Sequence, residues 1–158
     1  MNPVKVHSTA IDKEAELEQF YKDYYGEEVD FDFGPDDIYV GHCTHVSGII
    51  ASLNDNGLGG AGIAPNAEIY SCNVFMGENG AATEDICEGI AWAKENEVDI
   101  INMSLGSIAY DGVFASAVKD AYNSGIAVFC AAGNDDTSTY QYPASYDGAI
   151  SIAALDVG

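Results

Sequence analysis

The sequence predicts an α/β fold, in which helices flank a parallel β-sheet. From Val40 onward, segments with the periodicity of helices alternate with short apolar runs that are typical of strands. Turn-forming residues separate them, as in the glycine-rich stretch 57–62. This alternation is typical of parallel sheets whose strands are joined by right-handed helical crossovers.

Three helices are expected after residue 40. The first begins within residues 41–51, where apolar residues start to recur on one helical face. The second covers residues 83–96, with Thr83 as its N-cap and acidic residues in its first turn. The third covers residues 113–122 and is followed by Gly125, a residue type that favours helix C-termini.

Short apolar runs predict the strands that lie between these helices. The run at 126–132 is almost wholly apolar, which predicts a strand covered on both faces. The strands expected after residue 40 are 69–75, 98–104, 126–132 and 149–155.

Residues 1–39 differ in composition from the rest of the chain. They form an acidic N-terminal segment, which we interpret as a degenerate start of the domain that continues through residues 40–158. A short strand near residues 4–6 and a helix over residues 12–25 are expected within it.

The charge of the chain restricts its partners. The sequence has 26 acidic residues against 5 basic ones, for a formal net charge of -21. Because such a surface repels phosphate backbones and anionic lipids, neither nucleic acid nor a membrane is an expected partner. The charge suits cationic substrates, bound cations or a salty environment, and solubility alone is an equally good interpretation.

Targeting signals and membrane spans are not evident. No apolar stretch follows Lys5 within residues 1–20, so no signal peptide is predicted there. No apolar run reaches the length of a membrane span. The compartment is therefore left open.

The four cysteines do not form a CxxC pair, which argues against zinc-ribbon and thioredoxin-type sites. Cys72 and Cys130 lie in apolar runs and are expected to be buried thiols. Disulfide bonds among Cys43, Cys72, Cys87 and Cys130 are left open.

The ends of two predicted strands indicate a functional site. One strand ends in Ser104-Leu105-Gly106, and another ends in Ala132-Gly133-Asn134. In open α/β sheets, sites form beyond the carboxyl ends of the strands. Glycines at these ends let another backbone approach closely.

Five segments resemble the motifs of subtilases, the subtilisin-like serine proteases, and they occur in the family's order. The resemblance extends over about residues 40–156 and implies the start and centre of a subtilisin-like catalytic domain without its C-terminal part. The five segments are Gly41 to Ala51, Asn56 to Pro65, Ile101 to Gly106, Ala131 to Asn134 and Tyr142 to Tyr146.

The resemblance implies roles for two residues. His42 matches the general base, a role that suits imidazole because its pKa lies near neutrality. Asn134 matches the side chain that donates a hydrogen bond to the oxyanion. His45 matches a second histidine of the motif, which is structural.

A set of backbone segments is implied to bind an extended peptide substrate. Strand-edge pairing of this kind contributes affinity without reading side chains. Ser104, Leu105 and Gly106 match the paired edge. Ala131, Ala132 and Gly133 match one wall of the pocket for the residue before the scissile bond, with residues 73–80 opposite. The alternative for each of these segments is that it only packs at the end of its strand and binds no substrate.

The aspartate that orients the histidine is assigned to Asp12. It follows a possible strand and precedes His42 by an interval close to that in subtilisin. Lys13-Glu14 follows it where the family has Ser/Thr-Gly, which departs from the pattern.

The nucleophilic serine is not found in a matching context. In subtilisin it lies roughly 157 residues beyond the histidine, which is past Gly158 here. Cys43 replaces the glycine beside the histidine, and neighbouring helix positions are a poor nucleophile–base pair. The chain alone is therefore expected to be inactive.

No cofactor is required by this chemistry, but calcium is a possible ligand. The loop around Asn54 and Asn56 resembles a subtilase loop that binds Ca²⁺ through side-chain and carbonyl oxygens. A turn rich in asparagine and glycine is the alternative.

Two other function classes compete with a serine endopeptidase that acts on peptides or proteins. A non-catalytic pseudoprotease that still binds peptides is favoured by the departures at Lys13 and Cys43. An unrelated nucleotide-binding domain is suggested by residues 57–62, but no phosphate-binding lysine follows them.

Overall fold

The structure, a computed structural model, describes residues 6–10, 38–55, 57, 59–75 and 80–155. The chain divides into two compact units, Met1–Ala81 and Ala82–Gly158, and each is described by itself. The helix predicted over residues 12–25 lies outside the described residues. The domain boundary predicted at residue 40 stays a prediction.

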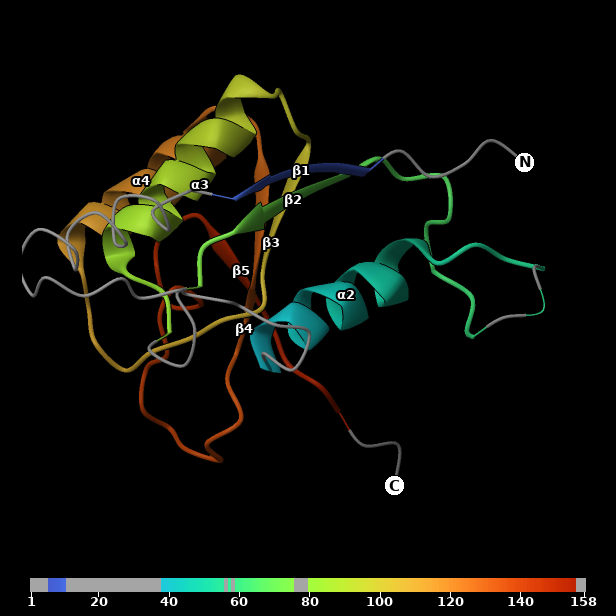
Figure 1. Ribbon diagram of the computed structural model, residues 1–158. Helices are drawn as coiled ribbons and strands as arrows, with labels where there is room; N and C mark the ends of the chain where they lie inside the picture. The colour runs from blue at the N-terminus through green and yellow to red at the C-terminus, as the bar shows by residue number, and fades with distance from the viewer. Residues whose placement is uncertain (1–5, 11–37, 56, 58, 76–79, 156–158) are drawn as a thin grey trace, which may run out of the picture. The chain divides into compact units, whose positions relative to one another are not determined.

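The first unit contains two parallel strands and one helix (Figure 1). Strand β1 (Val6–Ala10) pairs with β2 (Ile69–Asn73), with Val6 opposite Ile69. Helix α2 (Ile38–Ala51) packs against β2. The helix begins at Ile38, earlier than predicted, and β1 begins at Val6, the last residue of the strand predicted at 4–6.

The loop after α2 folds back onto the last turn of the helix. The backbone amides of Gly62, Ile63 and Ala64 donate hydrogen bonds of 3.0, 3.2 and 2.7 Å to the carbonyls of residues 52, 49 and 50. These carbonyls would otherwise lack partners, because the last turn of a helix leaves its acceptors unpaired. The glycine-rich segment thereby caps α2.

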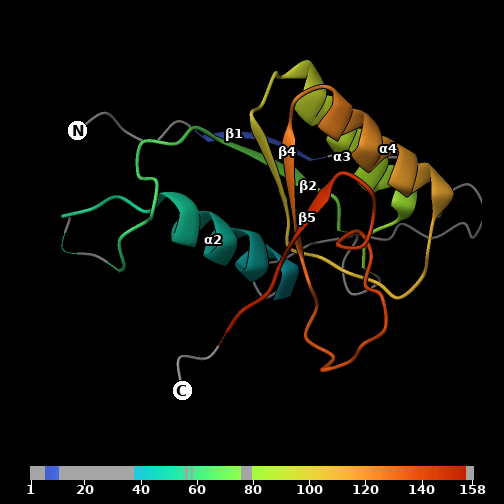
Figure 2. The same ribbon diagram turned by 180° about the vertical axis from the view of Figure 1, so that it is seen from behind.

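The second unit is a three-stranded parallel sheet with two helices. The strand order is β3 (Ile100–Met103), β4 (Ala127–Ala131) and β5 (Ala149–Ile152). Helices α3 (Thr83–Glu95) and α4 (Gly112–Asn123) lie side by side, and α4 packs on β4 and β5 (Figures 1 and 2). The predicted parallel α/β arrangement is confirmed, with strands shorter than expected.

The core of this unit lies between the helices and one face of the sheet. Val118 of α4 and Val128 of β4 are fully buried, and Cys130 is 1% exposed. The alternate residues of β4 are only half-buried. The prediction of a strand covered on both faces is therefore confirmed for one face, and the other face is half-buried.

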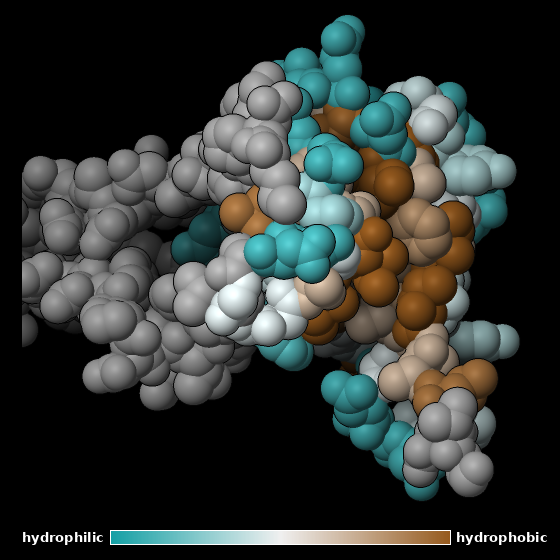
Figure 3. Space-filling model, turned by 90° about the vertical axis from the view of Figure 1, so that its right-hand side faces the viewer, coloured by the Kyte–Doolittle hydropathy of each residue, from teal (hydrophilic) through white to brown (hydrophobic). Residues whose placement is uncertain are grey.

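Apolar side chains also lie on the surface of the described chain, where they form the brown areas of Figure 3. On β5, Ile150 and Ile152 are 40% and 52% exposed. None of the described helices is long and apolar enough to cross a membrane.

The helix ends correct one prediction and confirm another. Ala82, not Thr83, is the N-cap of α3, and no side chain caps that helix. Helix α4 has a side-chain cap, because Asp111 Oδ1 accepts hydrogen bonds from the amides of Val113 and Phe114. Gly125 follows the C-cap Ser124 with a φ of 92°, as its position after the helix predicts.

Candidate active site

His42 lies on α2, in the first unit, and is half-buried. Its imidazole packs edge-on against the Phe75 ring, with the centroids 6.5 Å apart. Phe75 follows β2, so the strand that packs on α2 also brings an aromatic side chain to the histidine. The sequence did not indicate a role for Phe75, because a single aromatic residue at the end of a strand does not form a recognisable motif.

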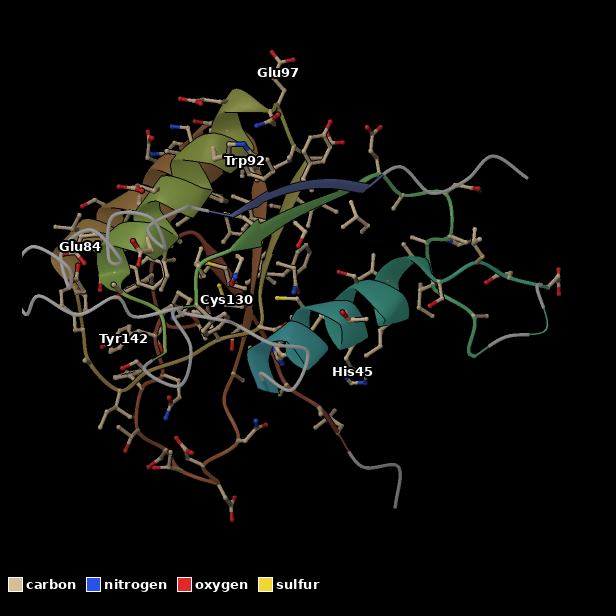
Figure 4. The ribbon with its side chains drawn as sticks, viewed as in Figure 1. His45, Glu84, Trp92, Glu97, Cys130 and Tyr142 are labelled. Atoms are coloured by element: carbon tan, nitrogen blue, oxygen red, sulfur yellow. The ribbon has the colours of Figure 1, made fainter. Side chains whose placement is uncertain are left out.

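The other histidine of this helix, His45, is exposed. Figure 4 shows it projecting from α2 on the side away from β1 and β2. His45 therefore does not contact strands β1 and β2.

Cys43 is a half-buried free thiol, and so is Cys72 on β2. Burial raises the pKa of both thiols, and the pKa of Cys72 is raised further by the charge of Cys43. A raised pKa leaves less thiolate at neutral pH, so neither group is an activated nucleophile. Cys130 is buried as predicted, whereas Cys72 is more exposed than expected, and all four cysteines are free.

In the second unit, two predicted substrate-binding segments share one edge of the sheet. Ser104, Leu105 and Gly106 directly follow β3, and Ala131 to Asn134 end and follow β4. Because β3 and β4 are parallel neighbours with Met103 opposite Cys130, their carboxyl ends meet at the same edge.

Asn134 is exposed at this edge. The preceding Gly133 has a φ of 97°, a conformation that favours glycine, and Ala132 donates a 2.9 Å backbone hydrogen bond to Ile152. The chain therefore turns sharply between the end of β4 and Asn134, which places the amide side chain in solvent, where it can donate to a ligand.

The segment after β3 is fixed by the fifth motif. Ser107 and Tyr142 exchange two backbone hydrogen bonds of 2.8 Å each. The Tyr142 ring packs against Tyr110 and Tyr146, with centroids 5.4 and 4.9 Å apart. Tyr142, which is labelled in Figure 4, thus ties the loop after β3 to the loop that leads to β5.

Gln141 lies beside these segments and was not predicted as a site residue. It is 8% exposed, and its side-chain amide donates a 3.0 Å hydrogen bond to Asp135. The one feature of the sequence that could have indicated Gln141 is its position directly before Tyr142-Pro143.

The candidate calcium loop is described in part. Asn54 is half-buried, and within the described chain its Oδ1 atom is buried and accepts no hydrogen bond. Asn56 and the predicted aspartate Asp12 lie outside the described residues. The described part contains no group of three or more His, Cys, Asp or Glu side chains suited to a metal ion.

The family model described as the subtilase family matches residues 5–157. The chain belongs to the subtilase family. The match extends over residues of both units and includes all five motif segments.

Relatives and solved structures agree with this assignment. Subtilisin DY of Bacillus licheniformis is 43% identical over 120 residues, which are 73% of this chain and 43% of subtilisin DY. Sphericase has a TM-score of 0.60 at 33% identity, over 68% of this chain and 37% of its own. A mutant of the PatA protease domain has a TM-score of 0.77 over 98% of this chain and 52% of its own, at 21% identity, which shows the fold alone.

This subtilase chain therefore spans less than half the length of subtilisin DY. The subtilisin-like α/β fold and its parallel sheet are confirmed. The residue roles implied by the motifs stay predictions.

Proposed function

We propose that this chain supplies the general base and the oxyanion donor of a subtilase that hydrolyses peptide bonds through an acyl-enzyme. His42 accepts the proton of the nucleophile and returns it to the leaving amine, and Asn134 donates to the developing oxyanion. Asp12 orients the imidazole and stabilises its protonated form.

One observation carries the proposal: two segments that are predicted to bind substrate lie at the carboxyl edge of neighbouring parallel strands. Ser104 to Gly106 offers a backbone edge for an extended peptide, and Ala131 to Gly133 follows the neighbouring strand. Asn134 comes next, exposed and free to meet the carbonyl of a bound peptide. Backbone pairing positions the peptide carbonyl, and the Asn134 side-chain amide then stabilises the negative charge that develops on the carbonyl oxygen.

The nucleophile is the part of this chemistry that the 158 residues do not provide in a recognisable context. We therefore expect no triad-dependent proteolysis by this chain alone. A fluorophosphonate probe, which reacts with activated serines, should leave the chain unlabelled, with an active subtilisin as the positive control. Labelling at any serine of residues 1–158 would contradict this expectation.

The second candidate function is a pseudoprotease that binds extended peptides without cleaving them. The half-buried Cys43 beside His42 favours it, because a larger side chain replaces the glycine of the motif. The gene sequence beyond residue 158 distinguishes the two candidates. A Gly-Thr-Ser motif about 40 residues further on supports the protease, and a continuation without it supports the pseudoprotease.

Calcium binding at the Asn54 loop is the remaining proposal. The buried Asn54 Oδ1, which accepts no hydrogen bond within the described chain, is a hard oxygen of the kind that Ca²⁺ prefers. Bound calcium would neutralise part of the acidic charge and hold the loop.

Calcium at about 100 times its dissociation constant should stabilise the folded chain by about 2.7 kcal/mol, and Asn54→Ala should abolish most of that gain. Thermal unfolding with calcium or with a chelator measures it, with magnesium at the same concentration as the control for ionic strength. Equal shifts in the native chain and in Asn54→Ala would contradict the assignment.

A further inference from the structure

Cys43 and Cys72 are a pair of free thiols in the first unit. Cys43 lies on α2, one residue after His42, and Cys72 lies on β2. Both side chains are half-buried, and neither forms a disulfide. The proposed function uses neither thiol, so the chemistry of this pair is independent of it.

Cys43 lies on the face of α2 that is turned toward the strands. The half-buried positions recur with the spacing of one helical face, at 43, 46, 47 and 50. The exposed His45 projects from the other side of the helix, away from β1 and β2 (Figure 4). Because α2 packs on β2, its half-buried face is the one that meets the strand.

Two contacts place the thiols beside each other. The His42 ring packs on Phe75, with centroids 6.5 Å apart, so this turn of α2 lies next to the end of β2. The negative charge of Cys43 also raises the pKa of Cys72. Salt screens charges that lie further apart than about 10 Å, so this effect indicates neighbouring thiols. Residues 42 and 43 of the helix thus lie alongside residues 72 to 75.

The packing of the two elements suits a disulfide. A disulfide joins cysteines whose Cα atoms are up to about 7 Å apart. Cα atoms of α2 and β2 lie within 8 Å of each other, so a small adjustment of the helix reaches that geometry. Once one thiol has reacted with an oxidant, the other is its neighbour, at an effective concentration of about 1 mM or more.

We propose that Cys43 and Cys72 are a redox pair, which a low-molecular-weight disulfide such as glutathione disulfide oxidises to a bridge between α2 and β2. One cysteine thiolate attacks a sulfur of glutathione disulfide and releases one glutathione thiolate. The second cysteine thiolate attacks the protein sulfur of this mixed disulfide and releases the other glutathione. The cysteines lose two electrons to glutathione disulfide, and their two protons end on the two glutathione molecules. The bridge holds α2, the helix that carries His42, on β2.

The test equilibrates the native chain at about pH 8 with glutathione and glutathione disulfide at about 0.1 mM each. Because the effective concentration of the partner thiol is about tenfold higher, the bridged form should exceed the mixed disulfides about tenfold. Acid then stops the exchange, and a glutamate-specific protease separates the four cysteines into peptides 29–68, 69–78, 85–88 and 98–158. Mass spectrometry without reduction should find peptide 29–68 linked to peptide 69–78.

Single variants identify the partners of the bridge. Cys43→Ser and Cys72→Ser should each abolish the linked peptides. Cys87→Ser is the matched control, because it removes another half-buried free thiol and should leave the link unchanged. Glutathione bound separately at both cysteines, two thiols still reduced at equilibrium, or a bridge to Cys87 or Cys130 in the native chain would overturn the pairing.

The melting temperature tests whether the bridge holds the helix on the strand. Bridging closes residues 43–72 into a loop and restricts the unfolded chain, so the bridged chain should melt several degrees above the same chain after reduction. The oxidant should give no such rise in Cys43→Ser. Equal melting temperatures of the bridged and reduced chains would contradict the role given to the bridge.

Discussion

Gly62 lies close against the backbone at the end of helix α2. A Cβ atom at this position would lie 2.4 Å from the backbone nitrogen of Ser52, a separation that the structure cannot accommodate without movement. The same residue donates the 3.0 Å hydrogen bond that begins the cap of α2. The helix that carries His42 thus depends on a glycine 20 residues away in the sequence.

Gly62→Ala should destabilise the chain by about 1–3 kcal/mol, the usual cost of forcing atoms into a packed site. Gly60→Ala is the matched control, because a Cβ atom there would meet nothing within 4 Å. Urea denaturation measures both free energies of unfolding. Equal stabilities of the two variants would contradict the packing described for Gly62.

Cys130 has the most perturbed thiol among the described residues. Burial raises its pKa from the ordinary value of 9.0 to about 12. Because the folded pKa is above the unfolded one, the protonated thiol's contribution to stability is complete below pH 9 and is lost as the pH rises toward 12.

We therefore expect iodoacetamide to alkylate Cys130 much more slowly than the half-buried Cys43 between about pH 8 and pH 10, since the thiolate is the reactive form. Peptide mass spectrometry after timed labelling gives both rates, and labelling in denaturant should abolish the difference. Equal rates in the folded chain would show that Cys130 is accessible.

At the scale of the elements, a side chain fixes the start of helix α4. Asp111 Oδ1 accepts hydrogen bonds of 2.8 and 2.9 Å from the amides of Val113 and Phe114, while its backbone amide donates to the Tyr146 hydroxyl. One residue thus links the helix start to the fifth motif. Helix α3 has no such side-chain cap.

Asp111→Ala should cost about 1 kcal/mol, within the usual range of 0.5–2 kcal/mol for loss of an N-cap. Thr83→Ala is the control, since Thr83 is the first residue of α3 and not its cap. It should change stability by less than about 0.5 kcal/mol. A larger loss from Thr83→Ala than from Asp111→Ala, by thermal or urea unfolding, would contradict these assignments.

The elements could be predicted from the sequence because their patterns are local. The periodicity of apolar residues predicted α3, α4 and the strands of both units, and the predicted ends differ from the observed ends by a few residues. The caps were harder, because they depend on contacts that periodicity does not contain. Ala82, the N-cap of α3, makes no side-chain hydrogen bond to the helix, and α2 starts before the apolar pattern does.

The candidate site was predictable where a motif carries it, at the start of a helix for His42 and at the ends of strands for the other segments. Ser104 to Gly106 and Ala131 to Asn134 were found in this way. Gln141 was not predicted, because its proximity to Gly106 and Gly133 arises from the folding of the chain and leaves no pattern in the sequence. A hydrogen bond such as the one to Asp135 is likewise visible only in the folded chain.

At the scale of the whole molecule, charge is the dominant feature. A formal net charge of -21 implies repulsion that opposes compaction, and dissolved salt screens it. Raising sodium chloride from about 20 mM to about 500 mM shortens the screening length several-fold, so the melting temperature should rise by several degrees. Potassium chloride at equal ionic strength should give the same shift. A fall in the melting temperature would contradict this view.

The central proposal is that His42, as the general base of the nucleophile, and Asn134, as the oxyanion donor, serve the hydrolysis of the same peptide bond. The general base must lie about 3 Å from the nucleophile, and the oxyanion donor must lie about 3 Å from the oxygen of the carbonyl that the nucleophile attacks. The two side-chain nitrogens must therefore lie within about 10 Å of each other. The most direct test is the distance between His42 Nε2 and Asn134 Nδ2 in a crystal structure. A separation within that limit is predicted, and side chains on opposite sides of the molecule would contradict the proposed active site.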